Sequence, residues 1–252
     1  MSPSGVPPLW IDGYAFGTRV LRGGEEPWKK PDELGLFLRE LSQLLSLDLV
    51  EIPVMPALLA WGELQGLALA SLDAGGMERL LADAGFRSHL KRGLETAAGA
   101  VGSRPLALSL PGPGALASLC EGEADEDMLD DLSLSLADLL RALFRSEFSL
   151  IRFTESDPRA LELFDPLTNV ARHYEATSVL VLMDDGASTA DDASGFDFVY
   201  GEGGDGKRLG AAFWEGASFA PSDDNRAFTE VPADMVPEAV LARLRQLSGQ
   251  AA

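Results

Sequence analysis

Acidic side chains follow most of the apolar, strand-like runs of this sequence. They are Asp12, Glu51, Glu155, Asp157, Asp184, Asp185, Glu202, Glu215 and Glu230. Carboxyl groups that lie close together raise one another's pKa, and they can then transfer protons or bind a hard cation. The alternative is that these acids cap helices or face water, as acids at strand ends commonly do.

Two of these acids differ from the others because they lie inside apolar strands. Glu51 lies in "LVEIPV" and Glu155 in "LIRFTES", where an unpaired carboxylate would be costly to bury. We therefore predict Glu51 and Glu155 as catalytic residues. Arg152 in the second run also needs a partner. A structural ion pair is the favoured role, and a clamp for a substrate anion is the alternative.

The remaining reactive residue types support few other chemistries. Cys120 is the one cysteine, so the chain has no internal disulfide and no CxxC pair, and we predict a buried, inert thiol. His89 and His173 fall on predicted helices and are expected to face solvent, which leaves a Ser-His-Asp triad with little support. No metal site is predicted, although the acids leave cation binding open.

Charge and composition exclude several classes of partner. The net charge of −20, from 20 basic and 40 acidic residues, argues against nucleic acid and against an anionic membrane surface. The 46% content of hydrophobic residues is typical of a globular protein. Neither a secretory signal nor an apolar run long enough to span a bilayer is evident. We predict a cytoplasmic protein that binds a small-molecule ligand.

The elements that must position these residues alternate between strands and helices. Apolar, β-prone runs begin at Pro8, Leu47, Pro105, Phe148, Ser178, Phe196, Leu209 and Ala227. Helical patterns lie between or after them, at 30–46, 77–102 (as one or two helices), 125–147, 158–176 and 231–247. Continuous apolar strands that alternate with helices predict an α/β fold, a (β/α)8 TIM-type barrel that occupies residues 1–252 as a single domain.

The second half of this pattern is thinner than the first. The segment "GASTADDASG" at 186–195 is polar and has no helical pattern. The glycine-rich "GEGGDGKRLG" at 201–210 lies between two strand-like runs and is typical of a hairpin turn. We therefore expect a barrel that is distorted or trimmed after its fifth strand.

Four segments resemble a known family in the order in which they occur. They are "PLWIDGYAFGTR" (8–19), "VEIPVMPALLAWG" (50–62), "GPGALASLCEG" (112–122) and "RFTESDP" (152–158). These segments resemble motifs of the uroporphyrinogen decarboxylase-like barrels, a group related to the cobalamin-independent methionine synthases and corrinoid methyltransferases. The resemblance implies a TIM-type barrel and a decarboxylase type of reaction.

The family's functional residues are only partly retained. Glu51 takes the position of the carboxylate that stabilises positive charge as CO2 leaves. Ser156 keeps the serine of the fourth-strand motif, and Arg19 matches a substrate-binding arginine only across a small gap. The residues that replace the family's other arginine, its tyrosine and its late histidine are Gly13, Leu119 and Pro232.

These replacements argue against the parent reactions. A porphyrinogen carries several carboxylates, and binding them requires bidentate arginine donors. A chain with a net charge of −20 that has Gly13 in place of the family's arginine would repel such a ligand. The methyltransferases hold zinc through a His-x-Cys-Gly motif at the fifth strand, where this chain has "MDDG" from Met183. Zinc activation of a thiol is therefore disfavoured.

The function predicted from the sequence is a lyase of the decarboxylase type that uses no cofactor and acts on a small organic substrate. The predicted substrate-binding residues are Trp10, Asp12, Arg19, Arg152, Ser156 and Asp184. One alternative is a catalytically degenerate barrel that serves as a binding or partner subunit of a hetero-complex. Another is a corrinoid-linked methyltransferase or demethylase. The sequence leaves open a homodimer or a complex with a homologous or catalytic subunit.

Overall fold

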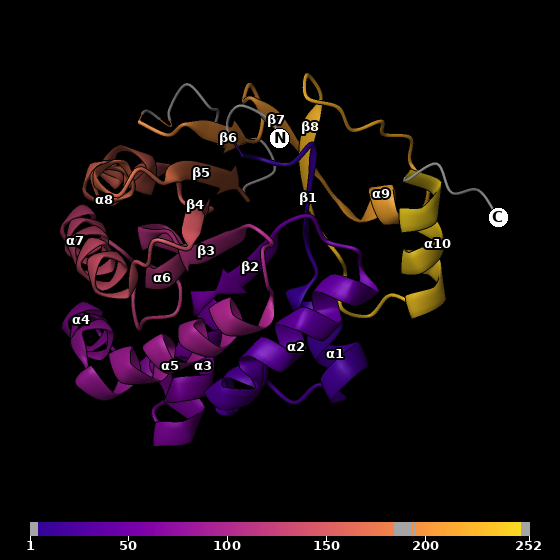
Figure 1. Cartoon of the computed structure of the whole chain (residues 1–252). Coiled ribbons are helices and arrows are strands. Elements are labelled where there is room, and N and C mark those ends of the chain that lie inside the picture. The colour runs from indigo at the N-terminus through magenta and orange to yellow at the C-terminus, as the bar shows by residue number, and fades with distance from the viewer. Residues whose placement is uncertain (1–4, 184–192, 194, 248–252) are drawn as a thin grey trace.

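Eight parallel strands form a nearly closed barrel, which confirms the predicted α/β TIM-type fold (Figure 1). The computed structural model describes residues 5–183, 193 and 195–247. The strands are β1 (Leu9–Asp12), β2 (Val50–Pro53), β3 (Leu106–Pro111), β4 (Phe148–Glu155), β5 (Thr177–Leu182), β6 (Phe198–Tyr200), β7 (Gly206–Leu209) and β8 (Arg226–Glu230).

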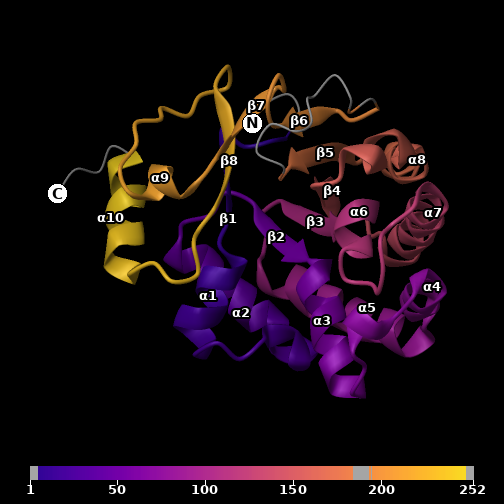
Figure 2. The same cartoon turned by 180° about the vertical axis from the view of Figure 1, so that it is seen from behind.

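Helices surround this sheet on its outer side, as the two opposite views show (Figures 1 and 2). The α-helices are α1 (Tyr14–Arg22), α2 (Pro31–Leu44), α3 (Val54–Gln65), α4 (Ala74–Ala82), α5 (Ala84–Ala100), α6 (Pro113–Ala117), α7 (Glu126–Leu143), α8 (Asp165–His173), α9 (Ala211–Trp214) and α10 (Pro237–Leu247). Short 3-10 helices are η1 (Pro27–Lys29), η2 (Leu69–Ser71) and η3 (Pro158–Leu163). None of the helices within the described ranges has both the length and the apolar character needed to cross a membrane.

Local sequence signals set the ends of the long helices. Pro31 opens α2, and the side chain of Asp125 caps α7 by accepting a hydrogen bond of 2.9 Å from the N–H of Met128. Asp83 caps α5 in the same way, which divides the predicted 77–102 segment into α4 and α5. Helix α3 was not predicted, because its nearly continuous apolar residues hide a helical period.

The strand order is β1-β8-β7-β6-β5-β4-β3-β2, and each neighbouring pair is parallel. Among the described residues, β1 and β2 are the ends of this order and do not pair with each other. The barrel is therefore closed everywhere except along one seam, which lies between β1 and β2.

The predicted hairpin between the sixth and seventh strands is wrong. β6 and β7 are parallel, and their register consists of one pair, Tyr200 with Gly206. The chain can make this connection in five residues because β7 begins beside the end of β6. Asp205 holds the turn by accepting a hydrogen bond of 2.9 Å from the N–H of Val199. The seventh strand was also misplaced, since it ends at Leu209 and α9 follows it.

Apolar side chains fill two separate parts of the molecule. The larger cluster lies between the outer face of the sheet and the helices. The smaller one fills the barrel interior and includes Trp10, Leu49, Ala107, Leu150, Val179, Tyr200 and Phe228. Because these side chains fill the barrel interior, polar groups gather only toward the carboxyl ends of the strands.

Candidate functional site

A cavity of about 430 Å³ opens at the carboxyl ends of the strands, and we call it the upper pocket. Its polar lining includes Asp12 from β1, Ser109 from β3, Arg152 and Thr154 from β4, and Glu230 from β8. Its apolar lining includes Pro53, Met55, Pro56, Leu110, Pro111 and Val231. TIM barrels place their active sites at this end, so the upper pocket is the candidate site.

The floor of the upper pocket is an ion-paired cluster from three strands. Nη2 of Arg152 donates to Oδ2 of Asp12 at 3.1 Å and to Oε1 of Glu51. The other oxygen of Glu51, Oε2, accepts a hydrogen bond of 2.8 Å from Nε1 of Trp10. We call these four residues the floor cluster. It links β1, β2 and β4, and its Trp10–Glu51 hydrogen bond crosses the seam.

Strand alternation explains why these side chains meet. Side chains on one strand alternate between the barrel interior and the helices, so Trp10 and Asp12 both point inward. Arg152 lies two residues beyond the interior Leu150 and points inward too. Its guanidinium lies over the Phe228 ring, 4.8 Å from the centroid. The Arg152 side chain is 4% exposed, so its charge depends on the two carboxylates.

Glu51 lies beneath the upper pocket and does not line it. Burial, which outweighs the attraction of Arg152, raises the pKa of Glu51 to about 7, and the nearby Asp12 carboxylate adds to the rise. Glu51 can therefore change its protonation state near neutral pH. That change would alter the charge of the pocket floor.

Glu230 adds a further carboxyl group beside Asp12. The two are register partners on β8 and β1, so their side chains leave the same face of the sheet. Glu230 as a whole residue is exposed, but partial burial of its carboxyl group raises its pKa, and the Asp12 carboxylate raises it further. The sequence placed Glu230 among the strand-end acids but not among the predicted site residues. The available signal was that Glu230 lies two residues after Phe228 on one strand, so both side chains leave the same face. Its position beside Asp12 could not be predicted, because it depends on the β1–β8 pairing.

Glu155 lies in a different environment from Glu51. Its Oε1 accepts hydrogen bonds from the N–H groups of Ser156 at 2.7 Å and Asp157 at 2.9 Å. Its Oε2 accepts one from the N–H of Gly114 at 2.9 Å. We call this arrangement the turn clamp, because it joins the chain after β3 to the chain after β4. Glu155 is fully buried and does not line the upper pocket.

Glycine is required where the turn clamp brings the two chains together. A Cβ atom at Gly114 would lie 2.4 Å from Cβ of Asp157 and 2.7 Å from Oε1 of Glu155. The "GPGALASLCEG" turn therefore has a packing function at the β3–β4 connection.

The other predicted ligand-binding residues lie outside the upper pocket or outside the described chain. Arg19 is exposed, and its Nη1 donates to the carbonyl oxygen of Ala233 at 2.6 Å. Ser156 is exposed beside the turn clamp. Asp184 lies outside the described residues. The structure thus brings Trp10, Asp12, Glu51 and Arg152 together and leaves Arg19, Ser156 and Glu155 apart from them.

Among the residues that the structure describes, no group of three or more His, Cys, Asp or Glu side chains is arranged to hold a metal ion. No protein-family model and no curated protein matches the chain. A comparison with solved structures finds a zinc-bound amidohydrolase from Burkholderia ambifaria, at 14% identity and a TM-score of 0.43. The match covers 98% of this chain and 73% of the amidohydrolase. Similarity at this level gives no information about function.

Proposed function

We propose that the upper pocket is an acid–base site that binds a small, largely apolar molecule and stabilises positive charge on it. The observation that carries this proposal is the grouping of Asp12, Glu51 and Glu230 around the guanidinium of Arg152. Asp12 and Glu51 share the Arg152 guanidinium, and Glu230, which both Arg152 and Arg208 attract, adds a third carboxyl group, so the site favours a ligand that is cationic or becomes cationic during the reaction.

Arg152 is better suited to position the carboxylates than to bind an anion. Its Nη2 already donates to Asp12 and Glu51. Nε and Nη1 have no hydrogen-bond partner among the described residues, but both atoms are buried and thus closed to an incoming anion. A ligand whose only charge is a carboxylate would also meet the negative charge of Asp12 and Glu230, whereas a carboxylate that carries a basic nitrogen would be partly compensated. The anion-clamp alternative for Arg152 is therefore not the one that we propose.

The proposed reaction is that of a lyase of the decarboxylase type. Glu230, whose pKa is raised, would donate a proton to an electron-rich carbon of the substrate. The cation that results would be stabilised by Asp12. The bond to the departing carboxylate would then break, its electron pair would neutralise the cation, and CO2 would leave. Glu230 would recover its proton from water, so these steps require only the chain's own acids.

Glu51 would set the charge of the site from below. When Glu51 is neutral, Asp12 is the one carboxylate in contact with Arg152, and when Glu51 is charged the floor carries an additional negative charge. The resemblance to the uroporphyrinogen decarboxylase-like barrels supports a charge-stabilising role for Glu51. Glu51 would act on the substrate only through Arg152 and Asp12, which makes it a positioning residue in this scheme.

A second candidate function is that of a binding subunit without catalysis. It is favoured by the ion pairing within the floor cluster, in which Nη2 of Arg152 already holds both Asp12 and Glu51. Both candidates predict the same ligand charge, and they differ in whether a bond is broken.

The charge preference of the upper pocket can be tested with three ligands that share a phenyl ring and differ in charge. Benzylamine, benzyl alcohol and benzoate can be titrated into protein that carries 13C-methyl methionine, with the Met55 methyl signal as the reporter. We expect benzylamine to bind most tightly and Glu230→Gln to weaken it about tenfold. The matched control is Glu202→Gln, at an exposed acid in the β6–β7 turn, and it should change nothing. Tighter binding of benzoate would contradict the proposal.

Catalysis can be tested separately through CO2 release. Wild-type protein and Glu230→Gln would be compared on a panel of small heteroaromatic carboxylates that contain basic nitrogen. Release that is lost in Glu230→Gln would support the lyase. Amine binding without CO2 release from any member of the panel would favour the binding subunit.

A further inference from the structure

The open seam of the barrel leaves main-chain groups without a neighbouring strand. The carbonyl oxygens of Pro8 and Asp12 accept hydrogen bonds from the chain of β8. In a parallel ladder alternate residues face opposite sides, so the N–H and C=O groups of Leu9 and Ile11 point into the seam. Among the described residues, no main-chain hydrogen bond joins β1 to β2. These groups therefore require partners from elsewhere.

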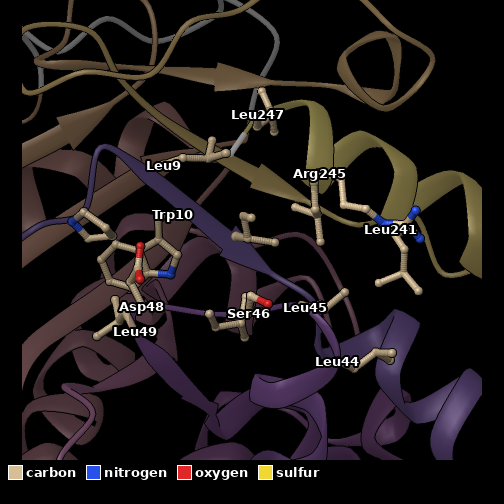
Figure 3. Close-up of a pocket in the computed structure, with 14 residues that line it drawn as sticks. Leu9, Trp10, Leu44, Leu45, Ser46, Asp48, Leu49, Leu241, Arg245 and Leu247 are labelled. Carbon is tan, nitrogen blue, oxygen red and sulfur yellow. The ribbon is translucent and has the colours of Figure 1, made fainter. Parts of the chain in front are cut away.

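A cavity of about 470 Å³ lies along the same seam, and we call it the seam pocket (Figure 3). Its walls come from β1, from the chain between α2 and β2, and from α10. Its aliphatic lining includes Leu9, Ile11, Leu44, Leu45, Leu241 and Leu244. The volume is in the range of small-molecule sites. The seam pocket and the upper pocket share none of their lining residues.

The lining of the seam pocket indicates the chemistry of a ligand. Its walls are mainly aliphatic, and Trp10 is the aromatic residue among its described lining. Asp48 and Arg245 add one acid and one base, so the lining has no excess charge. Figure 3 shows Asp48 near Trp10 and Arg245 on α10, across the pocket from each other. A flexible aliphatic chain would fit against the leucines, and because the lining carries one acid and one base, it favours neither sign of a charged head group.

We propose that the seam pocket binds a linear aliphatic chain that ends in an uncharged amide or a similar neutral group. An amide both donates and accepts hydrogen bonds, as a neighbouring strand would. It could therefore pair with the main-chain groups of Leu9 and Ile11 while its chain lies against the leucines. The proposal does not rest on the reaction in the upper pocket, although Trp10 belongs both to the seam-pocket lining and to the floor cluster.

The isoleucines of the chain provide a direct reporter of binding. The sequence contains three, Ile11, Ile52 and Ile151, and of these Ile11 lines the seam pocket. Octanamide would be titrated into protein with 13C-labelled isoleucine methyl groups, with octanoate and octyltrimethylammonium as charged comparisons. We expect saturable shifts of the Ile11 signal, with smaller changes at Ile52 and Ile151, and tightest binding for octanamide.

A variant that fills the seam pocket tests whether octanamide binds there. Leu244→Trp places a large side chain in the seam pocket from α10, and we expect it to weaken octanamide binding about tenfold or more. The matched control is Leu36→Trp, at a leucine on α2 that is 43% exposed, and it should leave the affinity unchanged. If the Ile52 and Ile151 signals show that Leu244→Trp misfolds, Leu241→Trp replaces it.

Several outcomes would overturn the seam-pocket proposal. They are the absence of saturable binding in the wild type, tighter binding of either charged probe, and undiminished binding when the pocket is filled. The same titration in protein with 13C-methyl methionine provides a further outcome: saturable shifts at Met55 without shifts at Ile11 would place the ligand in the upper pocket and would also overturn the proposal.

Discussion

The floor cluster and the turn clamp each bury a glutamate at the carboxyl end of the barrel, but they use it differently. In the floor cluster, Glu51 is bonded to an arginine and a tryptophan from two other strands. In the turn clamp, Glu155 accepts hydrogen bonds from three main-chain N–H groups. Burial raises the pKa of both. The comparison shows that partners, more than burial, separate a candidate functional carboxyl group from a structural one.

The largest effect is expected from breaking the turn clamp. Glu155→Ala leaves one buried and two partly buried N–H groups unpaired and should lower the free energy of unfolding by about 4 kcal/mol, because bonds to charged acceptors are among the stronger ones. Urea denaturation measures this loss. The neighbouring, exposed Glu162→Ala is the control and should change it by less than about 0.5 kcal/mol. A loss as small as the control's would show that the clamp is not structural.

Breaking the floor cluster should have a smaller and pH-dependent effect. Arg152→Met leaves Asp12 and Glu51 buried together, which should cost about 3 kcal/mol at pH 8. At pH 6 the loss should be smaller, because Glu51 takes up a proton and relieves the repulsion. Denaturation curves at the two pH values provide the comparison. An equal loss at both would contradict the link between Arg152 and Glu51 protonation.

Both glutamates were predicted from the sequence for the same reason, a charged residue inside an apolar strand. That pattern could not distinguish the functional environment of Glu51 from the structural one of Glu155. Arg152 lies 140 residues from Asp12 and 101 from Glu51, so their contact depends on barrel closure and strand register. The N–H groups that bind Glu155 belong to a turn whose geometry the residue types do not specify. The barrel itself was predictable, since alternating apolar strands and capped helices are local signals. The β6–β7 connection was not predictable, because a glycine-rich segment can form either a hairpin turn or a short connection between parallel strands.

The pH dependence of stability distinguishes the protonation of Glu51 from that of the other acids. Its folded-state pKa of about 7 lies above the ordinary value of 4.5. The folded state therefore binds the proton more tightly, and the free energy of unfolding should fall as pH rises from about 4.5 to 7, then level off. Glu51→Gln should reduce this fall by about 1–3 kcal/mol. Glu155 and Glu230 have raised pKa values too, so part of the slope should persist.

The smallest effect is expected outside both regions. Arg19→Ala removes an exposed hydrogen bond to Ala233, a residue that lines the upper pocket. Stability should change by less than about 1 kcal/mol. The affinity for benzoate should stay the same, since Arg19 does not face the pocket. Weaker benzoate binding in this variant would restore Arg19 as a ligand-binding residue.

The most direct test of the account is the titration of Glu51 itself. Carboxyl 13C signals of the glutamates, assigned with Glu51→Gln, can be followed by NMR from pH 4 to 9. We expect Glu51 to titrate near pH 7 and Asp12→Asn to lower its pKa by removing the adjacent negative charge. A Glu51 pKa near 4.5, unchanged in Asp12→Asn, would contradict the claim that Glu51 sets the charge of the upper pocket.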